Sequence, residues 1–127
     1  MASDADLTNE FFQVRRHGDI AVIVPSPQIE HLPETLLQPA AQMVLAPLKE
    51  DPPNQIIVDL SEVNYFGSAF ITFLLRCHEI VKPRGSELSL AGVNKQIREL
   101  LRTTNLDTLW ALYDNANEAI SALGGVD

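Results

Sequence analysis

The chain has 127 residues, which suits one domain with its own hydrophobic core and leaves no room for a second. Hydrophobic residues make up 46% of it, as in globular proteins and unlike disordered ones. Its net charge of −8 argues against a nucleic-acid-binding surface, because such surfaces need clustered Lys and Arg. Any role in transcription would therefore run through a protein partner.

Several other site classes lack a basis in the sequence. The single cysteine, Cys77, excludes an internal disulfide and a cysteine-rich metal site. No glycine-rich phosphate loop or metal-ligand spacing is present, so we expect no cofactor and no metal. No apolar run is long enough to span a membrane, and the acidic residues 1–10 do not resemble a signal peptide. We therefore expect a cytoplasmic protein without membrane insertion.

The first half of the chain predicts a hairpin and a helix. Residues 11–16 alternate in polarity and residues 20–24 form an apolar run, as two paired strands would. A helix is expected to start near Pro33, to kink near Pro39 and to stop near Pro47, because proline removes a backbone donor. The residues expected on its apolar face are Leu32, Leu36, Leu37, Ala40, Met43, Val44 and Leu48.

The second half of the chain alternates strands and helices. It predicts a buried strand at 56–58, a helix from Ser68 to about Lys82, a strand at 87–91, a helix capped by Asn94 and ending near Asn105, a strand at 109–113 and a helix at 115–123. The fold class is α/β, or α+β by a stricter label: a mostly parallel sheet of four or five strands with an opening hairpin and about four helices. We expect one domain over residues 11–123, a flexible segment at 1–10 and a loose tail at 124–127.

The helix that starts at Ser68 has an unusual distribution of apolar residues. At 100° per residue its core side carries Phe70, Phe73, Leu74, Cys77, Ile80 and Val81. Ile71 and Leu75 fall instead on the side of Ser68. They are either isolated exposed apolar residues, which are common, or part of a partner-binding patch around Ser68.

The order and spacing of five segments resemble the STAS domain of bacterial anti-sigma factor antagonists. These segments are 56–63, Phe66-Gly67-Ser68-Ala69, 84–93, Asn105-Leu106 and the closing helix at 117–122. The resemblance extends over about residues 11–123. It implies a non-enzymatic domain that binds an anti-sigma factor of the serine-kinase type and so releases a sigma factor.

The resemblance also assigns a role to Ser68. In that family an Asp-Ser-Ser-Gly motif opens the second helix, and its first serine is phosphorylated by the kinase. The matching residues here are Gly67-Ser68-Ala69-Phe70, so Ser68 is the candidate phosphoacceptor, while the acidic residue, second serine and glycine are replaced. Gly67 allows an unusual backbone turn, and a plain helix cap is the alternative role for Ser68.

The predicted partner surface combines this helix with the loop after the second strand. Its residues are Gly67, Ser68, Ile71, Thr72, Leu75, Arg76, Glu30 and His31. Asp59, at the end of the central strand, either bonds nearby loop amides or contacts the partner.

A serine enzyme is not expected. A serine nucleophile needs a histidine base, and His78 lies about 15 Å along the helix from Ser68. Phe66 and Phe70 occupy places where a hydrolase turn has small residues. We therefore predict no catalytic residues, with His17, His31 and His78 facing solvent and Trp110 and Tyr113 in the core or partly in it.

Two further functions remain open. The altered motif favours a phosphorylation-independent STAS subunit of a signalling or transporter-associated complex. A small-ligand sensor is a third reading, because a mostly apolar pocket leaves no motif. The sequence carries no signal for the oligomeric state.

Overall fold

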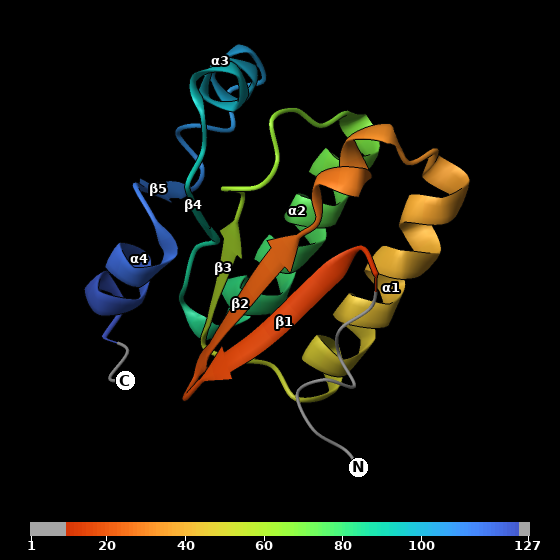
Figure 1. Cartoon of the computed structure of the whole chain (residues 1–127). Coiled ribbons are helices and arrows are strands. Elements are labelled where there is room, and N and C mark those ends of the chain that lie inside the picture. The colour runs from red at the N-terminus through yellow and green to blue at the C-terminus, as the bar shows by residue number, and fades with distance from the viewer. Residues whose placement is uncertain (1–9, 125–127) are drawn as a thin grey trace.

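The computed structural model describes residues 10–124, which form a five-stranded sheet flanked by helices (Figure 1). The sheet order is β1-β2-β3-β4-β5, as the chain runs. The elements are β1 (Phe12–His17), β2 (Ile20–Pro25), η2 (Pro27–His31), α1 (Glu34–Glu50), β3 (Gln55–Asp59), α2 (Ser68–Val81), η3 (Lys82–Arg84), β4 (Ser89–Ala91), α3 (Lys95–Thr103), β5 (Ala111–Tyr113) and α4 (Ala116–Ala122). The predicted fold class is confirmed.

The connections between the strands determine how they pair: a tight turn joins the opening hairpin, and longer crossovers join the parallel strands. β1 pairs with β2 antiparallel, with His17 opposite Ile20. Gly18 lies in this two-residue turn with a φ of 62°, a conformation that glycine adopts without strain. All later neighbours are parallel, so each needs a crossover.

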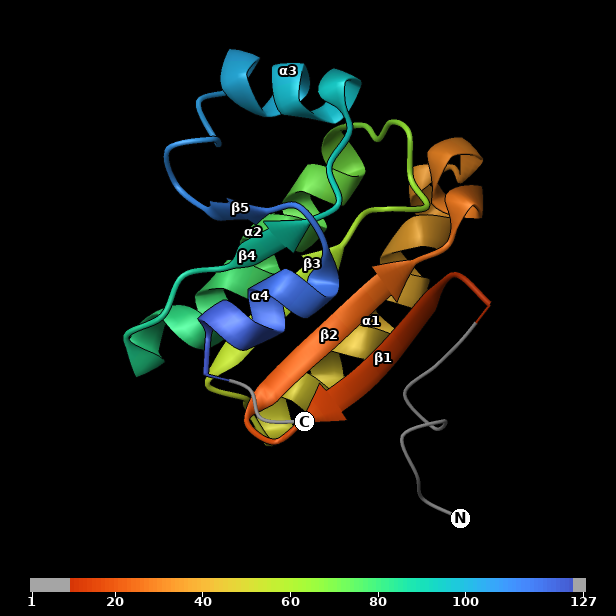
Figure 2. The ribbon, with the colours of Figure 1, turned by 60° about the vertical axis from the view of Figure 1, so that its left-hand side comes forward.

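The crossovers place the helices unequally on the sheet. Right-handed connections that always advance in one direction put α1 and α2 on the same face. Figures 1 and 2 show this pair behind the sheet, α4 on the opposite face and α3 beyond the end of the strands. The larger apolar cluster lies under α1 and α2, and a smaller one lies between the sheet and α4.

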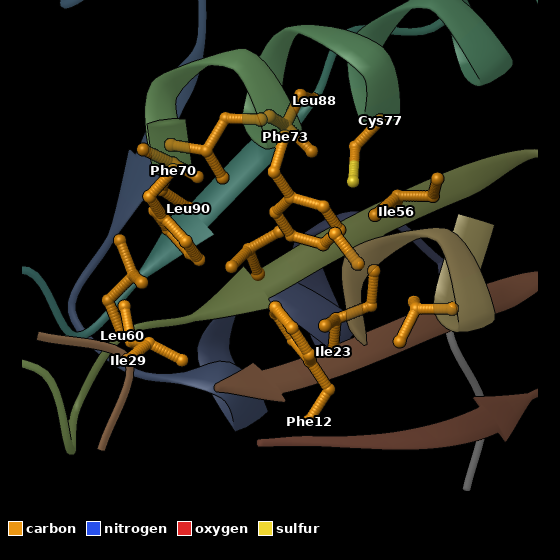
Figure 3. Packing of buried hydrophobic residues seen from close by; sticks show 14 of the residues in the cluster. Phe12, Ile23, Ile29, Ile56, Leu60, Phe70, Phe73, Cys77, Leu88 and Leu90 are labelled. Carbon is orange, nitrogen blue, oxygen red and sulfur yellow. The ribbon is translucent and has the colours of Figure 1, made fainter. Parts of the chain in front are cut away.

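The larger cluster is centred on aromatic rings (Figure 3). The ring of Phe73 lies 4.9 Å from that of Phe12 and 5.3 Å from that of Phe70. Cys77 is completely buried here, and this burial raises the pKa of its thiol far above the ordinary range. Cys77 is therefore a core residue, as the helical pattern predicted.

Helix α1 differs from its prediction. It continues through Pro47 to Glu50, so the predicted stop was wrong. Proline leaves the carbonyl four residues earlier without its helical donor, and those residues, Thr35 and Met43, are exposed, so water can hydrate them. Leu36 is 53% and Met43 60% exposed, so neither belongs to the buried face.

The outer parts of the chain bear on two predictions. The flexible segment predicted at 1–10 and the tail at 124–127 lie almost entirely outside the described residues. Between Glu10 and Gly124 no helix is long and apolar enough to cross a membrane.

The predicted solvent-facing role of His78 was wrong. The indole Nε1–H of Trp110 donates a hydrogen bond to His78 Nδ1 at 2.9 Å. Trp110 is buried, as expected, so its N–H needs this acceptor. Of the other histidines, His31 is exposed and His17 is half-buried.

This contact predicts an asymmetric effect of substitution at His78. His78→Leu should lower the free energy of unfolding by about 1–3 kcal/mol, because it leaves the buried Trp110 N–H without an acceptor. His78→Gln retains an acceptor and should lower it less. Urea denaturation measures both, with His31→Leu at an exposed position as the control. A His78→Leu protein as stable as His31→Leu would contradict the role of this bond.

Candidate functional site

The connection from β3 to α2 is held by a buried residue at every third position. Leu60, Val63 and Phe66 are each no more than 1% exposed. The residues between them, Asn64 and Tyr65 among them, are exposed. This spacing gives the connection a fixed inner side and an outer side directed to solvent.

Hydrogen bonds from two other segments fix the middle of this connection. The backbone N–H of Asn64 donates to Glu30 Oε2 at 2.7 Å. The Asn94 side chain donates to Asn64 O at 3.2 Å and, as the cap of α3, accepts from Ile97 N at 2.7 Å. Glu30 and Asn94 are therefore anchors of the connection.

The start of the connection is fixed against β4. Leu60 N donates to Ala91 O at 2.8 Å, and Ser61 N donates to Asp59 Oδ1 at 3.0 Å. Asp59 thus bonds a loop amide, which was one of its two predicted roles. A Cβ added to Gly92, whose φ is +69°, would lie 3.0 Å from Ser61 Cβ, so this close approach requires glycine.

Ser68 is the first residue of α2 and lies next to its cap. The capping position belongs to Gly67, which makes no side-chain bond, so the interpretation of Ser68 as the cap was wrong. Gly67 has a φ of −106° and a ψ of −167°, an extended conformation open to any residue, so the predicted unusual turn was also wrong. Ser68 is exposed, and its carbonyl accepts a bond from Thr72 Oγ1 at 3.2 Å.

The exposed side of α2 continues from Ser68 for two further turns. Thr72, Leu75 and Arg76 are exposed, and Leu75 is 39% accessible although it is a large aliphatic. Ile71 is half-buried and packs against the core, so only Leu75 of the predicted apolar pair projects freely. His31 is exposed on η2. The bond from Asn64 N to Glu30 holds η2 next to the connection that leads into α2.

One residue of this surface was missed in the sequence. Tyr65 is 46% exposed and lies three positions before Ser68. The buried positions Leu60, Val63 and Phe66 could have indicated it, since their spacing directs residue 65 outward. We define the Ser68 surface as Tyr65, Ser68, Thr72, Leu75 and Arg76.

The Ser68 hydroxyl belongs to an exposed residue at the start of α2. Among residues 10–124, no hydrogen bond joins the Ser68 hydroxyl to a base, and no group of His, Cys, Asp or Glu could hold a metal ion. The hydroxyl is accessible to another protein. The ring centroids of Phe66 and Phe70 lie 4.9 Å apart, and this packing holds the start of α2 in place.

Known proteins resemble the chain in both sequence and fold. The sequence pattern described as "Mlab, STAS domain" matches residues 33–113. An anti-sigma-factor antagonist (STAS) domain protein from Planctomyces limnophilus has a TM-score of 0.78 and 28% identity, covering 90% of this chain and 98% of that one.

Two more distant structures share the fold. SpoIIAA, an anti-sigma factor antagonist in its unphosphorylated form, has a TM-score of 0.74 and 14% identity, covering 91% of this chain and 98% of that one. A chain of the stressosome, described as a signal integration and transduction hub, has a TM-score of 0.68 and 14% identity, covering 87% and 94%.

The helix caps Asn94 and Asn115 predict separable effects of substitution. Asn94→Ala removes a helix cap and a bond to the Ser68 connection, whereas Asn115→Ala removes only the cap of α4, which accepts from Glu118 N at 2.8 Å. Each should lower the free energy of unfolding by about 0.5–2 kcal/mol. Only Asn94→Ala should also speed amide hydrogen exchange over residues 60–67. Equal exchange there in both variants would show that Asn94 does not hold the connection.

Proposed function

This chain belongs to the STAS domain family, and we propose that it is an anti-sigma factor antagonist that binds its partner through the Ser68 surface. The partner is an anti-sigma factor of the serine-kinase type, and its capture releases a sigma factor in the cytoplasm. The protein acts by binding and not by catalysis. Phosphorylation of Ser68 ends the binding.

The observation that carries this proposal is the position of Ser68. It stands exposed at the first helical residue of α2, on a backbone end fixed by Phe66 and Phe70. A kinase can reach the hydroxyl without unfolding the domain. The surface also presents Tyr65, a residue type enriched among the anchors of protein interfaces, and Leu75, which adds exposed apolar area.

The geometry gives phosphorylation a direct effect on binding. A phosphate adds a charge of about −1.5 to −2, and Leu75 lies two helical turns along the same side of α2 from Ser68. A charged phosphate on Ser68 therefore disfavours an apolar contact between Leu75 and the partner. It leaves the helix intact, because negative charge is favourable at a helix N-terminus.

A second function is a phosphorylation-independent subunit of a signalling assembly. The fold of a stressosome chain supports it, as does the replacement of three of the four motif residues by Gly67, Ala69 and Phe70. In such an assembly the Ser68 surface would be a permanent contact.

The first experiment tests both binding and modification. The protein is incubated with ATP and the kinase-type anti-sigma factor encoded nearest its gene; complex formation is followed by gel filtration, and intact mass is measured. We expect one added phosphate, mapped to Ser68, and none on Ser68→Ala. Thr72→Ala, which removes the neighbouring hydroxyl, should still be phosphorylated.

The outcomes separate the two functions. Phosphate on Ser68 with loss of binding supports a switching antagonist. Stable binding without phosphate indicates a constitutive antagonist, and neither binding nor phosphate favours the assembly subunit.

The apolar anchors can be tested separately from the phosphosite. Leu75→Ser and Tyr65→Ala should each weaken binding at least about tenfold, because each removes a large exposed side chain from the surface. Calorimetry measures the Kd. Leu109→Ser is the matched control, since Leu109 is 38% exposed and lies outside the Ser68 surface. If all three variants bind alike, the surface is assigned wrongly. Ile71 is left unchanged because it packs against the core.

A further inference from the structure

Helices α1 and α2 pack side by side (Figure 1), and two depressions lie along the seam between them. Near Ser68 the seam has a small notch of about 20 Å³. Its floor is apolar and its rim polar, and the lining residues are Leu37, Gln38, Ala41, Leu45, Ala69, Thr72, Phe73 and Arg76. A notch of this size admits about one methyl group or one water.

Further along the seam lies a larger and more open hollow of about 290 Å³. Its lining residues are Lys49 and Pro52, from α1 and the loop after it, and Arg76, Glu79 and Ile80 from α2. Arg76 lines both depressions, so they lie next to each other along the seam. Because Thr72 and Arg76 also belong to the Ser68 surface, the seam extends that surface towards the end of α1.

The hollow has the opposite charge to the chain as a whole. Lys49 and Arg76 against Glu79 give its lining a net charge of +1, while the chain carries −8. Both cations are exposed, and within residues 10–124 neither forms an ion pair. Two such cations beside the apolar Ile80 suit a carboxylate that arrives on a partly apolar surface.

We propose that the seam binds a helix of the anti-sigma factor, with a methyl group of an aliphatic side chain in the notch and a carboxylate between Lys49 and Arg76. This rests on the proposed function and adds a second contact beside the Ser68 surface. The binding mode is that of an amphipathic helix laid in a groove between two helices.

The spacing of the two depressions defines the partner further. Along α2 the notch is lined by positions 69–76 and the hollow by positions 76–80. Their midpoints are about six residues apart, or about 9 Å at 1.5 Å per residue. On a partner helix that lies along the seam, an aliphatic residue and an Asp or Glu four or seven positions away share one face, and their separations of about 6 and 10.5 Å bracket this distance.

A pair of charge reversals tests the proposal. Lys49→Glu and Lys82→Glu each change the net charge from −8 to −10, so they alter long-range attraction alike. Lys49 lines the hollow, whereas Lys82 is an exposed lysine outside it. The Kd of each is measured with the same anti-sigma factor as for the wild type, at low and at physiological salt.

We expect Lys49→Glu to weaken binding at least about tenfold and Lys82→Glu to stay within about threefold of the wild type. Glu79→Gln, which removes the one acidic group of the hollow, should tighten binding. Urea denaturation checks that all three variants are folded, which their exposed positions favour.

The outcomes separate this proposal from the one on which it rests. If the wild type binds and the two lysine variants bind equally, the seam contact is wrong while the antagonist function stands. If the wild type does not bind the anti-sigma factor, both proposals fall. A larger loss for Lys49→Glu together with a gain for Glu79→Gln supports the seam.

Discussion

Phe66 and Phe70 are both almost fully buried, and Ser68 lies between them in the chain. Because these two rings pack against each other in the core, the backbone at the start of α2 has little freedom to rotate, and residues 67 and 68 face solvent. The Phe66 ring packs on Phe70, which in turn packs on Phe73 within the core. The exposure of Ser68 is thus a consequence of core packing, and the stability of the domain supports the geometry of the site.

The one-directional order of the sheet has a similar consequence for the partner surface. Because α1 and α2 cover one face and α4 the other, the outer sides of α1 and α2 carry no further layer among the described elements (Figure 2). Their seam, the Ser68 end of α2 and the connection held by Glu30 and Asn94 therefore lie on one accessible part of the molecule. In a chain with net charge −8, the unpaired cations of this part can set which partners approach it.

Periodic and capping signals in the sequence predicted the order of the elements. The long-range contacts between them could not be predicted in this way. Asn94 caps α3 as predicted, and Asn115, predicted only as the first residue of the last helix, is the cap of α4; a cap involves residues three apart and so can be detected locally. The bonds from Asn64 to Glu30 and from Trp110 to His78 join residues 34 and 32 positions apart, so no local pattern reveals them. Ile71 was misplaced for a related reason: a helical projection gives its direction but not the depth of the neighbours beside it.

The replacement at Gly67 bears on which kinase could act. Gly67 occupies the cap with extended backbone and open space around its Cα, so the acidic residue of the family motif would fit here without strain. The fold therefore does not exclude an acidic residue at position 67.

An acidic cap would compete with a phosphate for the free N–H groups of the first helical turn and would repel it. Gly67 removes this opposition, but it also removes a carboxylate that a kinase could recognise. The substitution thus favours a partner whose recognition depends on the α2 side chains and the seam more than on the residue before the serine.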